Sequence, residues 1–235
     1  ESPGSVTMEV QDVPAIVQAA HARGVAVALD NTYAAGVMFD AFAHGVDVSM
    51  QALTKYVGGH SDLLLGSVSA RDKNAYERLG PIYQQLGLAV SPDDCSLALR
   101  GLQTLAVRLE VLERNTLEIA KWLADQPLIA QVLHPALPSC PGHDVWTRDF
   151  SGSTSVFSFI FTDAISADQV VNFINRLKIF KIGMSWGGVN SLALVYPDLQ
   201  RPAQDFGGRI VRLNIGLEKV GDLTDDLAQA MAQLS

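Results

Sequence analysis

A lysine and an aspartate in the first quarter of the chain have the types and surroundings of a catalytic pair. Lys55 follows a mostly apolar segment and precedes two glycines, and Asp30 closes an earlier apolar run. A partly desolvated lysine has a lowered pKa, and its amine can form a Schiff base with an aldehyde. A carboxylate can keep a pyridine nitrogen protonated. Together the two residues predict a site for pyridoxal phosphate (PLP), provided that both reach the same ring.

Each of these residues also has a simpler interpretation. Lysine is rarely buried, so Lys55 alone would be read as an ordinary surface residue. An aspartate directly after a strand commonly serves as a cap or turn residue, which would account for Asp30 without any ligand. The PLP hypothesis therefore requires the two side chains to share one pocket.

Arg212 is a third candidate, because it lies in the otherwise apolar run of residues 210–216. A buried guanidinium is costly unless it is paired. Two interpretations remain open. The side chain binds a ligand carboxylate through two parallel hydrogen bonds, or it forms a salt bridge with an acidic residue of the same chain.

A rival motif is the sequence Gly-Met-Ser-Trp-Gly at residues 183–187, which matches the G-x-S-x-G nucleophile turn of α/β hydrolases. That family needs its histidine after the serine, whereas all five histidines precede Ser185. The hydrolase interpretation is therefore disfavoured. The chain has no HExxH and no paired CxxC motif, so no metal site is predicted.

The composition is that of a globular protein without the features of nucleic-acid or membrane binding. The 235 residues are 48% hydrophobic and 18% charged, and the formal net charge is -8. There is no basic stripe to neutralise phosphates, and no run of about 18 uncharged apolar residues to cross a bilayer. Cys95 and Cys140 are isolated, so we expect reduced thiols in a cytoplasmic protein.

The apolar pattern predicts an α/β protein in which strands precede the candidate residues. Asp30 and Lys55 each follow a predicted strand, which is where open α/β sheets bind ligands. A domain boundary is expected near residue 100, between segments 1–100 and 101–235. We expect helices at 12–23, 39–45, 72–86, 93–124, 167–178 and 223–234, strands at 25–29, 46–51, 63–69, 156–161, 191–196 and 210–215, and a loop at 134–152.

These segments resemble one family, the Cys/Met metabolism PLP-dependent enzymes of fold type I, essentially from end to end. The resemblance implies the carboxyl-terminal part of a large PLP-binding domain, of the aspartate aminotransferase-like type, followed by a smaller α+β domain. The family segments are residues 29–32, 48–56, 58–62 and 100–105. Those that resemble the cystathionine β-lyase branch are residues 134–138, 148–152, 185–188 and 212–218.

The resemblance implies roles in binding the cofactor. Lys55 would hold PLP covalently and transfer protons, Asp30 would pair with the pyridine nitrogen, and Thr54 would hydrogen-bond the phosphate. Many relatives have a phosphate-binding serine where this chain has Ala52. One phosphate contact is therefore missing or replaced.

The resemblance also implies a substrate and a reaction. Arg212 would bind the α-carboxylate of an amino-acid substrate, and Ser185 and Trp186 would line the same pocket. The reaction would be α,β-elimination from cystathionine or a related cysteine S-conjugate. It would release homocysteine or another thiol, with pyruvate and ammonia. A γ-lyase or γ-synthase of the same family, and a non-catalytic interaction module that keeps only the fold, remain as alternatives.

Family members are longer than this chain, which begins where they are already well into the PLP domain. We therefore expect a missing N-terminal segment of the same enzyme to supply a phosphate loop, a stacking tyrosine and residues that reach a neighbouring subunit. The isolated 235 residues are expected to have little or no lyase activity. The resemblance implies a homotetramer built as a dimer of dimers.

Overall fold

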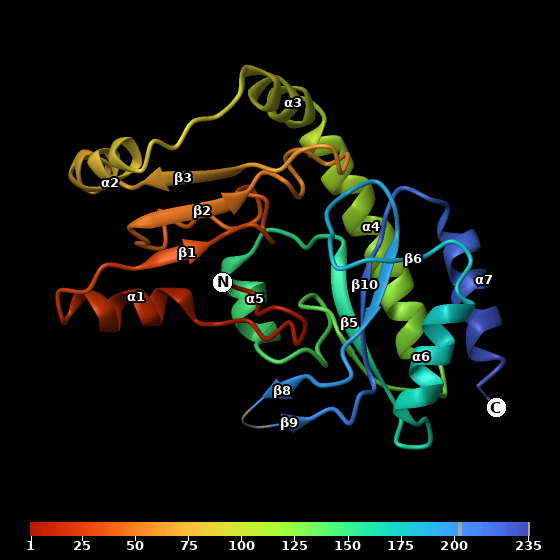
Figure 1. The fold of residues 1–235 in the computed structure, drawn as a ribbon. Helices are drawn as coiled ribbons and strands as arrows, with labels where there is room; N and C mark the ends of the chain where they lie inside the picture. Colours follow the sequence, from red (N-terminus) through yellow and green to blue (C-terminus); the bar gives the residue numbers. More distant parts are fainter. Residues whose placement is uncertain (202–203, 235) are drawn as a thin grey trace.

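The computed structural model describes residues 1–201 and 204–234, and in these the strands form separate sheets (Figure 1). A three-stranded sheet lies in the first third of the chain, and a five-stranded sheet lies in the second half. A short pair, β8 (Gln200–Arg201) and β9 (Gln204–Asp205), projects beside the larger sheet.

The three-stranded sheet brings the ends of its first two strands to one edge. β1 (Ala28–Asp30) pairs in parallel with β2 (Val48–Ala52), and β3 (Gly66–Ala70) pairs with β2 antiparallel. In this register Asp30 lies opposite Met50. Because β1 and β2 run in the same direction, Asp30 and the turn that follows β2 lie on the same side of the sheet.

Two helices flank this sheet. α1 (Val13–His21) starts where the Asp12 side chain accepts the Ala15 N–H at 3.0 Å, which caps the first turn. α2 (Lys73–Gln85) has no buried residue in this chain. Its exposed side chains include Tyr76, which is 68% exposed. An exposed aromatic residue on an uncovered helix indicates a surface available for contact with further protein.

The five-stranded sheet has the order β4-β5-β10-β7-β6. Its pairs are antiparallel except β6 with β7, which is parallel. The central strand β10 lies between β5 and β7, so its side chains are buried on both faces. The strand bounds are β4 (Ile129–Leu133), β5 (Val156–Phe161), β6 (Lys181–Ile182), β7 (Leu192–Val195) and β10 (Ile210–Asn214).

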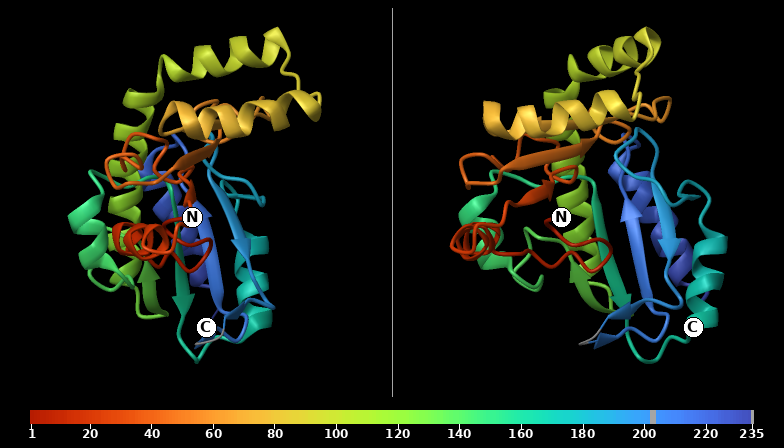
Figure 2. Two further views of the ribbon diagram at one scale, coloured as in Figure 1. Left: turned by 90° about the vertical axis from the view of Figure 1, so that its left-hand side faces the viewer. Right: turned by 60° about the vertical axis from the view of Figure 1, so that its left-hand side comes forward.

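Three helices pack on one face of this sheet, as Figures 1 and 2 show: α4 (Leu105–Ala124), α6 (Ala167–Arg176) and α7 (Val220–Met231). Side chains alternate along β5, so that every second residue faces these helices. Phe157, Phe159 and Phe161 belong to that core. Val156 and Ile160 instead join a second core with the amino-terminal segment. Burial on both faces explains why β5 is apolar at every position except Ser158, which is itself buried.

The helix predicted over 93–124 is two helices, α3 (Pro92–Leu102) and α4, with a break at residues 103–104. The Gly101 carbonyl accepts the Thr104 N–H and the guanidinium of Arg108, at 3.2 and 2.7 Å. These bonds replace the one that a continuous helix would make at this carbonyl. The leucine spacing continues across this break, so the sequence pattern predicts one continuous helix.

The helix predicted over 39–45 is wrong, because the segment forms only turns. The Asp40 carbonyl accepts the His44 N–H, and Gly45 then takes a left-handed conformation with φ 84°. One helical turn that ends at such a glycine cannot propagate.

The loop predicted over 134–152 contains a helix, α5 (His143–Asp149). It starts after Gly142, whose φ is 80°, and its seven residues are too few for a clear apolar period. The strand β4 was also not predicted. The predicted strand at 156–161 is confirmed residue for residue.

The helix α4 connects the two parts of the fold. Its first turns contribute Leu105 and Leu109 to a cluster with Tyr56, and its last turns contribute Ile119 and Leu123 to the core of the larger sheet. The domain boundary near residue 100 falls inside α3 and stays a prediction. No helix in the described residues is long and apolar enough to cross a membrane.

Candidate cofactor and substrate site

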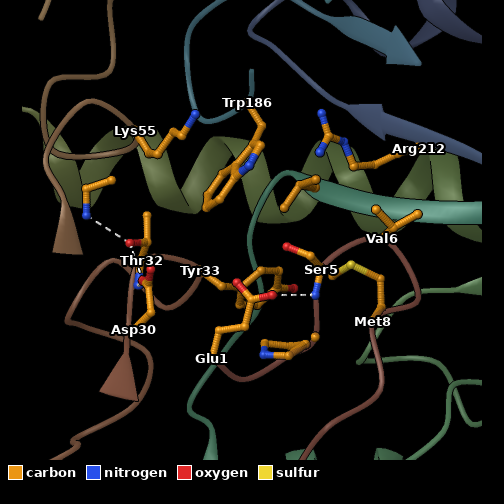
Figure 3. A pocket seen from close by; sticks show the side chains of 14 residues that line it. Glu1, Ser5, Val6, Met8, Asp30, Thr32, Tyr33, Lys55, Trp186 and Arg212 are labelled. Carbon is orange, nitrogen blue, oxygen red and sulfur yellow. Dashed lines mark hydrogen bonds between the residues drawn. The ribbon is translucent and has the colours of Figure 1, made fainter. Parts of the chain in front are cut away.

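One cavity brings together side chains from six separate parts of the chain (Figure 3). Asp30 comes from the end of β1, Lys55 from the turn after β2, Trp186 from the loop between β6 and β7, and Arg212 from β10. The amino-terminal segment and β5 supply the other two parts of the wall. The remaining lining residues are Glu1, Pro3, Gly4, Ser5, Val6, Met8, Thr32, Tyr33, Ala52 and Val156.

Asp30 is held by Thr32, a residue for which no role of its own was predicted. Oδ1 of Asp30 accepts the Thr32 N–H at 2.9 Å and the Thr32 hydroxyl at 2.5 Å. The Thr32 hydroxyl in turn accepts the Ala52 N–H at 2.8 Å. Within the described residues, Oδ2 of Asp30 has no hydrogen-bond partner. This oxygen is therefore free to pair with a ligand.

Lys55 contacts Ser185 and Trp186, the two residues of the loop between β6 and β7 that were also predicted to line the pocket. Its Nζ donates to Oγ of Ser185 at 3.0 Å and lies 5.2 Å from the centre of the Trp186 ring. Burial and, secondly, the positive charge of Arg212 lower the pKa of Lys55 below its usual value. A larger share of the amine is therefore neutral near pH 7, as nucleophilic or base chemistry requires.

Thr54 does not line the cavity. Its hydroxyl donates to the Leu65 carbonyl at 3.2 Å and accepts the Leu65 N–H at 3.0 Å. These two bonds tie the turn that carries Lys55 to the segment leading into β3. The phosphate contact assigned to Thr54 stays a prediction.

Arg212 is 9% exposed and makes no ion pair with an acidic side chain in the part of the chain that the structure describes. Its Nη2 donates to the Met184 carbonyl at 2.5 Å, and its guanidinium lies 5.5 Å from the centre of the Tyr196 ring. Burial lowers the pKa of Arg212 from its usual value. A buried cation with no acidic partner favours the interpretation in which the partner is a ligand carboxylate.

Sequence reasoning missed the amino-terminal part of the wall and Tyr33. Tyr33 is 6% exposed and lines the cavity beside Thr32. The polar run Asp30-Asn31-Thr32 at a strand end was a signal for this part of the site. Nothing in the composition of residues 1–8 pointed to a pocket, because their place there is set by packing against distant residues such as Val156 and Phe206.

The side chains fit PLP. The cavity wall supplies a partly desolvated amine for the aldehyde in Lys55 and a carboxylate oxygen free to pair with the pyridine nitrogen in Asp30. It also supplies the guanidinium of Arg212, which has no acidic partner among the described residues, for the substrate carboxylate. The donor set therefore has one group each for the aldehyde of the cofactor, its pyridine nitrogen and the carboxylate of an amino-acid substrate.

A protein-family comparison supports the same class of enzyme. Residues 1–232 match the family described as Cys/Met metabolism PLP-dependent enzyme. The chain belongs to this family, and the cofactor of the family is PLP.

Curated relatives cover the whole chain. It is 45% identical over 240 residues to a protein described as a putative cystathionine beta-lyase from Rhizobium johnstonii, and 42% identical over 242 residues to cystathionine beta-lyase MetC of Escherichia coli. Both alignments cover 100% of this chain, but only 60% and 61% of the two relatives. The chain thus spans about three fifths of the length of the curated relatives it matches.

A solved structure has the same fold. The cystathionine gamma synthase of Xanthomonas oryzae pv. oryzae, in complex with aminoacrylate and cysteine, superposes with a TM-score of 0.91 at 31% identity. The match covers 99% of this chain and 62% of that one. The predicted fold class is confirmed: the chain is an α/β protein with the carboxyl-terminal part of the large domain and the smaller domain of a fold type I enzyme.

Proposed function

We propose that this chain is the carboxyl-terminal portion of a PLP-dependent carbon–sulfur β-lyase that cleaves L-cystathionine or a related cysteine S-conjugate. The observation that carries the proposal is the shared cavity of Lys55, Asp30 and Arg212. Curated relatives at 45% and 42% identity bear the name cystathionine beta-lyase, which supports the same reaction.

The position and contacts of each residue in the cavity support the role proposed for it. PLP, when bound, supplies an electron sink for charge that develops at the substrate Cα. Asp30, fixed by Thr32, offers its free Oδ2 to the pyridine nitrogen. Lys55 would hold the aldehyde of the cofactor through its amine, and the same amine would accept the Cα proton of the substrate. The Ser185 hydroxyl at 3.0 Å holds that amine in place.

Arg212 is assigned to the substrate. The Met184 carbonyl holds Nη2, which orients the planar guanidinium, and the remaining donors are available for the α-carboxylate. The Trp186 ring next to the amine of Lys55 excludes water from one side of the pocket. A carboxylate bound at Arg212 fixes which substrate carbon faces Lys55, because the two side chains line the same cavity.

The overall reaction balances with water as the only other reactant. The Cα proton is removed, the Cβ–S bond breaks, and the sulfur leaves as a thiolate that takes up a proton to give homocysteine. Water releases the three-carbon remainder as pyruvate and ammonia. A γ-lyase or γ-synthase is the second candidate, favoured by the structural likeness to a cystathionine gamma synthase. γ-Elimination would give 2-oxobutyrate in place of pyruvate.

Product analysis tests the proposal. The full-length protein with PLP and L-cystathionine should form pyruvate and a free thiol in equal amounts, which lactate dehydrogenase coupling and a thiol reagent measure. Formation of 2-oxobutyrate would move the assignment to γ-elimination. Borohydride should label Lys55 irreversibly in the PLP-loaded protein. If no adduct forms and neither oxo acid appears, the chain is a non-catalytic interaction module and the enzyme proposal is wrong.

We further propose that an N-terminal segment of the same enzyme completes the site and covers the exposed apolar side chains of the first part of the chain. These include Leu64, Tyr76 and Leu86, at 87, 68 and 66% exposed. Residues 1–100 would belong to the PLP-binding domain and residues 101–235 to the smaller domain. Isolated residues 1–235 are expected to show little or no turnover.

We also propose an oligomeric state and a cellular location for the full-length protein. A homotetramer built as a dimer of dimers is expected from family membership, and light scattering of the full-length protein would measure it. A cytoplasmic location is supported by the two thiols, since Cys95 and Cys140 are both free.

A further inference from the structure

Three hydrogen-bonded side chains lie buried beside the candidate site. Tyr56 follows the lysine in the turn after β2, Ser155 precedes β5, and Asn214 ends β10. None is more than 1% exposed. Oη of Tyr56 lies 2.9 Å from Oγ of Ser155, which lies 2.8 Å from Oδ1 of Asn214. We call these three residues the buried network.

The direction of each bond follows from the chemistry of the groups. Oδ1 of Asn214 can only accept, so the Ser155 hydroxyl donates to it. That hydroxyl must then accept from Tyr56, whose oxygen also accepts the Ser155 N–H at 3.0 Å. Nδ2 of Asn214 donates to the Asn190 carbonyl at 2.9 Å. Each member has a defined donor or acceptor role, and such networks are rigid in a low-dielectric interior.

The buried network touches both halves of the active site. Oδ1 of Asn214 accepts the N–H of Gly187, the residue after Trp186, at 2.8 Å. Tyr56 directly follows Lys55, and its ring lies 5.5 Å from that of Trp186. Gly187 has φ 81°, and an added Cβ would lie 3.1 Å from Cβ of Lys55. The turn that carries Lys55 and the loop that carries Trp186 are therefore packed too closely for a side chain at Gly187, and the buried network contacts both segments.

We propose that the buried network is a positioning device that holds the Lys55 amine in register with Ser185 and Arg212. The inference deepens the proposed lyase function and rests on it. The Ser185 hydroxyl belongs to the loop anchored at Gly187, and Arg212 lies two positions before Asn214 on β10. Loss of one link should let the lysine turn and the loop shift relative to each other.

Such a shift has a measurable consequence. Burial and the nearby charge of Arg212 lower the pKa of Lys55, so a change in their spacing changes the reactivity of the amine. Proton transfer to a group displaced by about 1 Å is slower by about a hundredfold. A network that served only stability would leave both quantities unchanged at temperatures where the protein is folded.

The test uses matched pairs in the full-length holoenzyme. Ser155→Thr and Ser155→Val add the same bulk at a fully buried position, but only threonine keeps the hydroxyl. Tyr56→Phe removes one oxygen with little change in shape and serves where the position-155 variants fold poorly. Four quantities are measured: kcat, KM, the pH midpoint of the cofactor absorbance, and the pH midpoint of Lys55 acylation by acetic anhydride in the apoprotein.

A distant variant controls for stability. Asp226 is 4% exposed and accepts the backbone N–H groups of residues 178–180, among them that of Ile179 at 2.8 Å, and none of these residues lines the cavity. Asp226→Asn should lower the melting temperature without touching the cavity. Its kcat, KM and pH midpoints should therefore match those of the wild type.

The expected result is a loss of about tenfold or more in kcat for Ser155→Val and Tyr56→Phe, with a shift of about 0.5 pH unit in both midpoints. Ser155→Thr should retain the wild-type midpoints. The positioning role is overturned if kcat and both pH midpoints of Ser155→Val match those of Ser155→Thr, and those of Tyr56→Phe match those of Asp226→Asn. A wild-type protein that forms no oxo acid would overturn the lyase assignment instead, while acylation of the apoprotein still reports on the network.

Discussion

The amine of Lys55 lies 3.0 Å from the hydroxyl of Ser185, although 130 positions separate the two residues. The first belongs to the turn after a strand of the smaller sheet, and the second to a loop of the larger sheet. Arg212 donates to the Met184 carbonyl at 2.5 Å, so the guanidinium proposed to bind the substrate is hydrogen-bonded to the loop that carries Ser185. The reactive amine is therefore positioned by residues of both sheets.

Lys55→Ala should remove covalent attachment of PLP and lower turnover by at least about a thousandfold, because no other lysine lines the cavity within the described residues. Borohydride reduction followed by peptide mass analysis measures attachment, and pyruvate formation measures turnover. Lys73→Ala is the control, since the Lys73 side chain is 86% exposed and pairs only with Glu77. Retention of a reducible adduct in Lys55→Ala would show that another residue carries the cofactor.

Arg212→Gln should raise KM for cystathionine by about ten- to a hundredfold, because a charge-assisted hydrogen-bonded pair contributes about 1.5–3 kcal/mol. The substitution should also raise the pKa of Lys55, since the charge of Arg212 contributes to lowering it. Acylation of Lys55 in the apoprotein would then require a higher pH.

Arg100→Gln is the matched control for Arg212→Gln. Arg100 is an exposed residue that pairs with Asp62 at 2.9 Å, outside the cavity. KM and the acylation profile should match the wild type. An unchanged KM in Arg212→Gln would instead assign the substrate carboxylate to another group.

The parts of the site that the sequence predicted are those where a residue type conflicts with its local pattern. An arginine within an apolar strand and an aspartate at a strand end both stand out, and both line the cavity. Thr32 belongs to the polar run at this strand end, but its local environment does not predict which contact its hydroxyl makes. Its importance comes from its bond to the Ala52 N–H, a contact created by the pairing of β1 with β2.

The fold shows the same division between local and long-range causes. Strong apolar periods located β5 and α6, and the Ser166–Gln169 capping box marks where α6 begins. The break between α3 and α4 depends instead on Arg108, which binds the carbonyls of Tyr56 and Gly101 at 2.7 Å each. Because one of these partners is distant in sequence, no local pattern could have located the break.

Thr32→Val should weaken PLP binding by about tenfold, because it removes the hydroxyl that fixes Asp30 and leaves the Ala52 N–H without its acceptor. Thr32→Ser keeps both bonds and should bind PLP almost as the wild type does. Fluorescence titration of the apoprotein with PLP measures the affinity directly. Equal affinities for the two variants would show that Asp30 does not depend on this hydroxyl.

His134 predicts how stability depends on pH. Its side chain is fully buried, Nδ1 accepts the Ala136 N–H at 3.2 Å, and the ring packs edge-on against Phe157. Burial lowers the pKa of His134 to about 3, from an ordinary value of 6.5. Between these pH values the unfolded chain binds one more proton at this residue than the folded chain. The contribution of His134 to the free energy of unfolding is therefore present above pH 6.5 and decreases as the pH falls below this value.

The loss attributable to His134 should be about 1–2 kcal/mol between pH 6.5 and pH 5, because one proton is taken up there only on unfolding. His134→Asn isolates it, because an asparagine can accept the Ala136 N–H in the same type of turn but cannot be protonated. This variant should be less stable at pH 7 yet lose less stability on acidification. Urea unfolding at pH 6.5 and pH 5 measures both proteins, and equal losses would mean that His134 is not held neutral by burial.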